Sequence, residues 1–197
     1  MKDLKKMILT RETAFTIDEI RQIFSDVSEN TLKVALYRAK LNGDLLNPYK
    51  GIRTLPVYDE KELACKLKKN SYISLESVLY DAGAIFQAYF NTKTCIAESS
   101  ADLTIGGINY RYTKVKESLL YNDTYVRQYE NYRIATPERA LCDYVYLFPN
   151  AGIDAPEVFH SPNSDAKFKV LFPFYPKATQ EKIKKLIDMT GYKVFKY

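Results

Sequence analysis

The stretch ATPERALCDYVY, residues 135–146, carries the chain from an extended segment into a helix. Thr136 is a favoured N-cap residue, and Pro137 suits the first helical position because its missing N–H would have no intrahelical partner there. Glu138 lies in the first turn, where the helix dipole favours a negative charge. From Ala140 onward, apolar residues recur with helical spacing. The stretch therefore predicts a strand that leads directly into a capped helix with one buried face.

Glu138 and Arg139 have a second interpretation, as the acid and base of an enzyme. Adjacent helical residues point about 100° apart, so the two side chains cannot easily converge on one atom. We interpret Glu138 as part of the helix start and expect Arg139 to lie along the surface.

The sequence on either side of this stretch alternates between strand and helix patterns. Residues 71–83, SYISLESVLYDAG, predict a helix with a cap at Ser74 and an end at Gly83. TKTCIAES (92–99) predicts a strand, and two hairpins are expected with turns at 106–107 and 130–131. A helix over 179–189 and a last strand at YKVFKY would end the chain. This order predicts an α+β domain over residues 71–197.

The first 70 residues have a different pattern. TIDEIRQIF (16–24) opens with a capping box in which Thr16 and Glu19 cap each other. After a short break, TLKVALYRAKLNG (31–43) predicts a second helix that is capped by Ser28 or Asn30. Two short strands with a turn at 50–51 follow, and a polar linking helix covers 59–70. A short helix in 1–9 would precede them all. This order predicts an N-terminal winged helix-turn-helix domain over residues 1–70.

The second predicted helix offers a basic face. Lys33, Tyr37 and Lys40 share one side, and another side can bury Leu32, Ala35, Leu36 and Ala39. Phosphate contacts require Lys and Arg on one surface, and base contacts usually come from the first turn of such a helix. We therefore expect DNA to contact Asn30, Thr31, Lys33, Tyr37, Arg38, Lys40, Lys50 and Arg53.

Charge supports an anionic partner for this part of the chain. The 197 residues have a formal net charge of +5, of which +4 belongs to residues 1–70 and +1 to residues 71–197. An excess of positive charge in one segment favours binding to nucleic acid.

Other kinds of chemistry have weak signals. The chain has one histidine, His160, and lacks a GxGxxG or GxxxxGK phosphate loop. A nuclease-like metal site built from Glu98, Asp102 and Lys114 is conceivable, but carboxylates beside a turn are usually solvated. The sequence predicts no catalytic residue, no metal and no cofactor.

The expected location is the cytoplasm. Cys65, Cys95 and Cys142 are widely spaced and odd in number, which fits reduced thiols. No apolar run approaches the roughly 18 to 20 residues that span a membrane. The charged N-terminus does not look like a secretory signal.

Two motifs together resemble a known family. SYISLESVLYDAG, followed some fifty residues later by RIATPERALCDYVYL (133–147), resembles the AbiEi-like antitoxins of type IV toxin–antitoxin systems, which act in abortive infection. The resemblance covers about residues 1–148 and places the winged helix where that family has it.

The resemblance implies a two-part function. The N-terminal domain would bind inverted repeats in its own promoter and repress transcription. The C-terminal domain would counter a nucleotidyltransferase toxin without forming a tight complex. The basic antitoxin surface implied for this chain comprises Arg111, Lys114, Lys116, Arg127 and Arg133.

Two alternatives stay open. The protein is a non-enzymatic interaction module if its winged helix contacts only protein. It is an enzyme acting on nucleic acid if carboxylates hold a metal ion.

Overall fold

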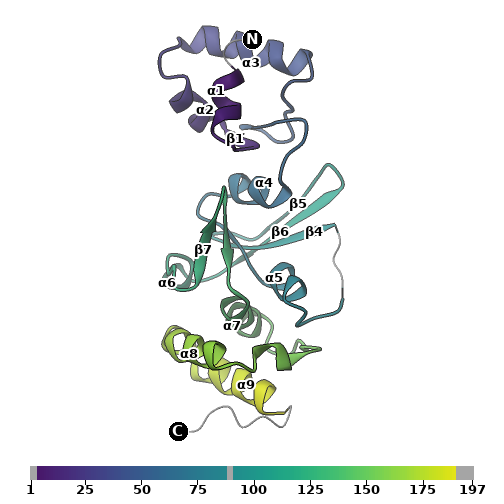
Figure 1. Cartoon of the computed structure of the whole chain (residues 1–197), viewed down its shortest axis with the longest axis vertical. Coiled ribbons are helices and arrows are strands. Elements are labelled where there is room, and N and C mark those ends of the chain that lie inside the picture. Colours follow the sequence, from purple (N-terminus) through teal and green to yellow (C-terminus); the bar gives the residue numbers. More distant parts are fainter. Residues whose placement is uncertain (1–3, 88–90, 190–197) are drawn as a thin grey trace.

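The computed structural model describes residues 4–87 and 91–189 of the chain. Figure 1 shows three tiers along the longest axis: an N-terminal module at the top, a mixed β-sheet in the middle and C-terminal helices at the bottom. The expected α+β fold class is confirmed. The last strand expected at YKVFKY lies outside the described residues.

The N-terminal module combines three helices with a two-stranded antiparallel sheet. Its elements are α1 (Leu4–Leu9), β1 (Ala14–Thr16), α2 (Ile17–Ile23), α3 (Glu29–Leu41) and β2 (Ile52–Thr54). The capping box of α2 is present, since Thr16 and Glu19 each accept a bond from the other's backbone N–H. Ser28, one of the two expected candidates, caps α3 by accepting from the N–H of Thr31.

The expected hairpin after α3 is reduced to a single bridge. Leu46 pairs with Thr54, while β2 takes β1 as its ladder partner. Pro48 has no N–H to donate, so the segment before the turn cannot extend a regular ladder. The turn of residues 49–51 consequently does not lie at the tip of a two-stranded hairpin, because only the single Leu46–Thr54 bridge joins the segments on either side of it.

The middle tier is a six-stranded mixed sheet in the order β5-β6-β4-β3-β8-β7. Pairing is parallel between β3 and β8 and between β4 and β6, and antiparallel elsewhere. Both expected hairpins are confirmed, as β5 with β6 and β7 with β8. The strands are β3 (Tyr72–Ile73), β4 (Thr92–Ala97), β5 (Ala101–Ile105), β6 (Ile108–Lys114), β7 (Val126–Tyr129) and β8 (Tyr132–Ala135).

Helices cover both faces of this sheet. α4 (Glu60–Leu67) packs on one face, and α5 (Glu76–Asp81) and α7 (Pro137–Leu147) pack on the other. The central strand β4 is therefore buried on both sides. The remaining helices are α6 (Glu117–Leu120), η1 (Pro156–Phe159), α8 (Pro162–Leu171), η2 (Phe172–Phe174) and α9 (Lys177–Asp188). None of the described helices is long and apolar enough to cross a membrane.

Two apolar cores stabilise these tiers. The smaller core fills the N-terminal module around Phe15, Ile20 and Leu32, and the larger one fills the space around the six-stranded sheet. Neighbouring residues of β1 belong to different cores, because Ala14 faces the larger core and Phe15 the smaller. The expected linking helix α4 is integrated into the larger core through the fully buried Leu63. The division into domains at residue 70 stays a prediction.

The helix expected over residues 71–83 is shorter than predicted, because Tyr72–Ile73 form strand β3 and α5 begins only at Glu76. Its start also differs from the expected capping. Leu75 precedes the helix with φ of 61° and ψ of −138°, and it makes no side-chain cap. The Ser74 hydroxyl instead donates to Asp143 Oδ2 across 2.9 Å. A buried carboxylate requires donors, and this requirement outweighs the local preference of serine for an N-cap.

The expectation that Arg139 lies on the surface is wrong. Thr136 caps α7 and Pro137 opens it, as expected, but the Arg139 side chain is completely buried. Its Nε donates to Asp143, and its two Nη atoms donate to Tyr72 and to three carbonyl oxygens. Glu138 is also buried and accepts from Ser164 and Lys167 of α8. Glu138 therefore joins α7 to α8, and Arg139 joins α7 to β3.

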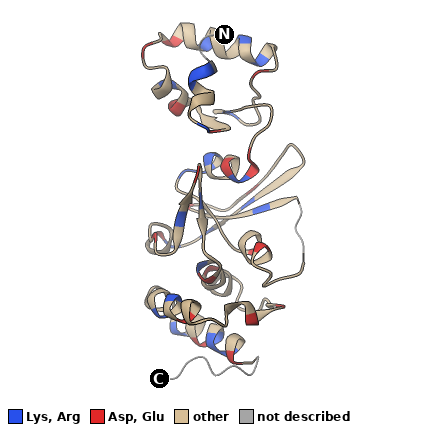
Figure 2. Cartoon of the chain, in the orientation of Figure 1, with Lys and Arg blue, Asp and Glu red and all other residues tan. Residues whose placement is uncertain are grey.

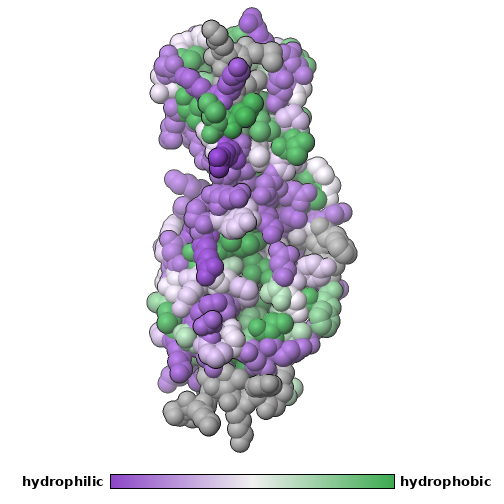
Figure 3. Space-filling view, in the orientation of Figure 1, coloured by the Kyte–Doolittle hydropathy of each residue, from purple (hydrophilic) through white to green (hydrophobic). Residues whose placement is uncertain are grey.

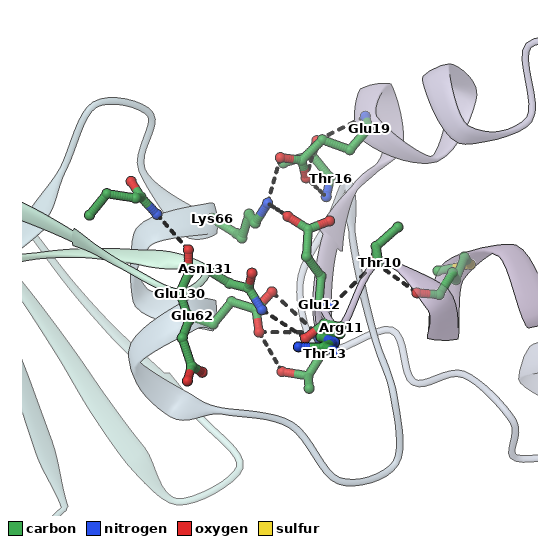
Figure 4. A network of polar contacts seen from close by, with 12 residues as sticks. Thr10, Arg11, Glu12, Thr13, Thr16, Glu19, Glu62, Lys66, Glu130 and Asn131 are labelled. Carbon is green, nitrogen blue, oxygen red and sulfur yellow. Dashed lines mark hydrogen bonds and ion pairs between the residues drawn. The ribbon is translucent and has the colours of Figure 1, made fainter.

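A polar network joins the N-terminal module to the sheet (Figure 4). Glu62 of α4 accepts from the N–H and hydroxyl of Thr13, the latter across 2.6 Å. Lys66, one turn further along α4, donates to Glu12 across 3.1 Å and to Glu19 across 2.5 Å. In Figure 3 the molecule narrows at this level, and its surface there is mostly hydrophilic. Ion pairs and hydrogen bonds thus add to the apolar contacts of β1.

Candidate nucleic-acid interface

Helix α3 lies at the end of the molecule, opposite the C-terminal helices (Figure 1). Its Leu32 and Ala39 are buried against the module, and this orientation leaves the opposite face to solvent. Figure 2 shows several basic residues along the helix. The helix thus packs on the module through one face and exposes the opposite face to solvent.

A groove runs beside α3. Lys33, Tyr37 and Lys40 line it from the helix, and Asn47 and Arg53 line it from the segment that follows. Its volume is about 360 Å³. Residues with i, i+4 and i+7 spacing lie on one helical face, as the sequence pattern requires. The structure therefore brings together four of the eight expected DNA contacts: Lys33, Tyr37, Lys40 and Arg53.

The groove contains both signs of charge. Arg53 is held by bonds from Nη1 to Asn47 Oδ1 (2.5 Å) and to its neighbour's carbonyl, and its partial burial lowers its pKa. A guanidinium keeps its charge through such a shift. Glu29 offsets part of the positive potential, because it pairs with Arg21 at 2.9 Å and with Lys33 at 3.8 Å. Lys40 and Arg53 have no carboxylate partner among the described residues.

The other four expected DNA contacts lie outside the groove. Asn30 and Thr31 are exposed in the first turn of α3, where the Thr31 hydroxyl bonds to that of Ser28. Arg38 is exposed on a different side of the helix, and Lys50 is exposed in the turn before β2. All four remain accessible to a ligand larger than the groove.

Three polar groove residues were not expected from the sequence: Arg21, Glu29 and Asn47. Arg21 belongs to α2 and is not part of the i, i+4 and i+7 pattern of basic and aromatic residues on α3. Asn47 precedes Pro48, which marks a loop but gives no indication of what the loop faces.

The five basic residues of the expected antitoxin surface have different environments. Arg111 pairs with Asp102, and Arg133 pairs with Asp123 and donates to the carbonyl of Asn70. The other three are exposed or at an edge and have no ion-pair partner among the described residues: Lys114, Lys116 and Arg127. Arg111 and Lys114 belong to β6, whereas Arg127 and Arg133 belong to the hairpin at the opposite edge of the sheet.

The carboxylates and the histidine considered for catalysis each have a hydrogen-bond or ion-pair partner. Glu98 accepts from Asn70 and Tyr121, and Asp102 pairs with Arg111. His160 contacts the carbonyl of Ile187 through Nε2 at 2.9 Å. In residues 4–87 and 91–189, no group of three or more His, Cys, Asp or Glu side chains is arranged to hold a metal ion.

The fold and the groove define an α+β protein with a basic helix displayed at one end. No protein-family model matches the chain, and a search of curated proteins finds no match. Among solved structures, the crystal structure of the RV2827C protein from Mycobacterium tuberculosis is similar, with a TM-score of 0.53 and 11% sequence identity. The match covers 97% of this chain and 78% of that chain. At this identity the likeness shows the fold alone.

Proposed function

We propose that this protein is a DNA-binding transcriptional autorepressor and the antitoxin of a type IV toxin–antitoxin system. The observation that carries the proposal is the position of α3 at one end of the molecule, with Lys33, Tyr37 and Lys40 on a groove shared with Arg53. Such a helix can enter a DNA major groove while the lysines contact phosphates.

The module around α3 favours a winged helix-turn-helix. α2 and α3 are separated by a short break, and β1 and β2 form a small sheet beneath them. The turn at residues 49–51 follows α3 and serves as a reduced wing, from which Lys50 reaches the DNA backbone. Arg53 lies deeper and supports the edge of the groove.

The antitoxin half rests on the resemblance of two motifs, and one structural relationship supports it. The two motifs are some fifty residues apart in the sequence but adjacent in the fold. β3 of the first motif pairs in parallel with β8 of the second through Ile73 and Ile134. Tyr72 and Ser74 also donate to Asp143 of α7. A pattern shared with a family is more informative when its parts form one structural unit.

The proposed partners are an operator DNA and a toxin. The operator is an inverted repeat in the protein's own promoter, and the partner is a nucleotidyltransferase toxin in the same cytoplasm. The toxin is countered without a tight complex, through the exposed basic residues Lys114, Lys116 and Arg127 and their paired neighbours Arg111 and Arg133.

A DNA-binding titration tests the repressor half. The purified protein is titrated onto its own upstream DNA at two salt concentrations, with scrambled DNA as competitor. We expect specific binding that weakens steeply with salt. Lys33→Ala and Lys40→Ala should each reduce the salt slope by about one, whereas Lys185→Ala, an exposed lysine of α9 at the other end, should not. If scrambled DNA displaces the protein from its upstream DNA as effectively as unlabelled upstream DNA does, the repressor half is rejected.

Co-expression with the adjacent toxin gene tests the antitoxin half. The Lys33→Ala/Lys40→Ala variant should lose repression of its promoter and still restore growth, because the two activities are assigned to different tiers. Replacement of Lys114, Lys116 and Arg127 by Ala should leave repression of the promoter intact and abolish the rescue of growth. Growth arrest that the wild-type chain fails to relieve would reject the antitoxin half.

A further inference from the structure

The outermost side of α3 is apolar. Val34, Tyr37 and Leu41 are 49%, 63% and 67% exposed, and their i, i+3 and i+7 spacing aligns them along the helix. Asn30 is exposed one turn before Val34 on the same side. We call these four residues the crest of α3. The crest points away from the buried face formed by Leu32 and Ala39, so nothing in the described part of the chain covers it.

Basic side chains flank the crest on both sides. Lys33 and Lys40 lie on the groove side, and Arg38 lies on the opposite side. An apolar line between two basic edges is complementary to a DNA major groove, where base edges lie between two phosphate backbones. Packing against the same helix of a second copy would bring these cations together, which charge repulsion disfavours.

We propose, building on the DNA-binding function above, that the crest recognises thymine methyl groups. In the major groove only thymine presents a methyl group, and apolar side chains contact it. Val34 and Leu41 supply these contacts, and the Asn30 amide can bond to the N6 and N7 atoms of a neighbouring adenine. The operator half-site is therefore rich in A·T pairs where the crest lies.

Uracil-substituted DNA isolates this interaction, because uracil lacks only the C5 methyl group. The protein is titrated onto its upstream DNA made with thymine and onto the same DNA made with uracil. Burial of one methyl group contributes about 0.8 kcal/mol, so each thymine contacted should improve the affinity about fourfold. The wild-type protein should prefer thymine DNA by about fourfold to fifteenfold, for one or two contacts.

Matched variants identify the side chains that carry this preference. Val34→Ala and Leu41→Ala should each lower the ratio of thymine to uracil affinity, and the double variant should bring it near one. Val170→Ala is the control, since Val170 is equally exposed at 49% but lies on α8. Lys33→Ala should weaken binding to both DNAs equally and leave the ratio unchanged.

The outcomes separate the inference from the function on which it rests. Specific binding with equal affinity for thymine and uracil DNA would overturn the inference and leave the repressor intact. An unchanged ratio in the Val34 and Leu41 variants would also overturn it. A dimer that these variants dissociate in sedimentation experiments would assign the crest to contact between copies. Failure to distinguish upstream from scrambled DNA would reject both proposals.

Discussion

Arg139 and Asp143 lie one turn apart on α7 and form an ion pair in which both side chains are completely buried, with Nε and Oδ1 3.1 Å apart. The Arg139 side chain makes five hydrogen bonds, which matches its five N–H donors. Asp143 accepts three further bonds, from the hydroxyls of Tyr72, Ser74 and Tyr175. The pair thus ties α7 to β3, to the segment around α6 and to the chain before α9.

Removal of one partner of this pair should be strongly destabilising. Asp143→Ala leaves the Arg139 charge buried without a counter-charge, which typically costs about 3 to 5 kcal/mol. Urea unfolding would measure the loss. Asp102→Ala is the matched control, because it breaks the exposed pair with Arg111 and should cost less than about 1 kcal/mol. Equal losses in the two variants would contradict the structural role of the buried pair.

Glu138 should make stability depend on acid pH. Burial raises its pKa, but the bonds from Lys167 and Ser164 outweigh burial and hold the pKa below its ordinary value of 4.5. A depressed carboxyl pKa stabilises the fold above the unfolded-state pKa, and this contribution is lost as pH falls through the folded-state pKa.

Glu138→Gln tests this dependence. The variant should be less stable than the wild type near neutral pH, and the difference should shrink as pH falls below about 4.5. Unfolding free energies measured across that range give the answer. A difference that is constant with pH would show that the Glu138 carboxylate does not titrate in this way.

Lys66 should control the attachment of the N-terminal module. Its ammonium group joins Glu12 and Glu19, and its side chain is only 12% exposed. Lys66→Met leaves the two carboxylates close together without a cation, so we expect faster hydrogen exchange in β1 and α2. Lys61→Met is the control, because Lys61 lies on the same helix but pairs with Asp81. Similar exchange in both variants would show that the ion pairs of Lys66 do not hold the N-terminal module in place.

The three cysteines should be unreactive in the folded protein. Burial raises the pKa of Cys65 to about 11 and raises those of Cys95 and Cys142 well above the ordinary value. Few thiolates are therefore present at neutral pH, and Cys95 and Cys142 are in addition completely buried. Titration with a thiol reagent should detect all three thiols after unfolding and almost none before it. Rapid reaction of the native protein would contradict this burial.

Elements with local signals were predictable. The capping box of Thr16 and Glu19, the cap at Thr136 and the glycine turn at 106–107 involve groups only a few residues apart. The helical face shared by Lys33, Tyr37 and Lys40 follows from the same short-range geometry. Such features depend on backbone sterics and neighbouring side chains, which are fully specified by a short segment.

Long-range features were not predictable in this way. Arg139 carries no local mark of burial, because four of its side-chain hydrogen bonds go to distant segments: three to carbonyls of residues 119–124 and one to the hydroxyl of Tyr72. Arg53 and Asn47 likewise belong to the groove only because β2 pairs with β1.

The amino-acid sequence by itself determined the caps of α2 and α7, the two hairpin turns of the six-stranded sheet and the basic face of α3. The tertiary structure alone decided which charges are buried, which cations share a groove and which side of α3 stays open. The physical reason is the separation in sequence between interacting groups. Hydrogen bonds within a helix or hairpin require only residues that are close together in the sequence. Burying a charge requires partners from across the fold, and these meet only when the whole chain has folded.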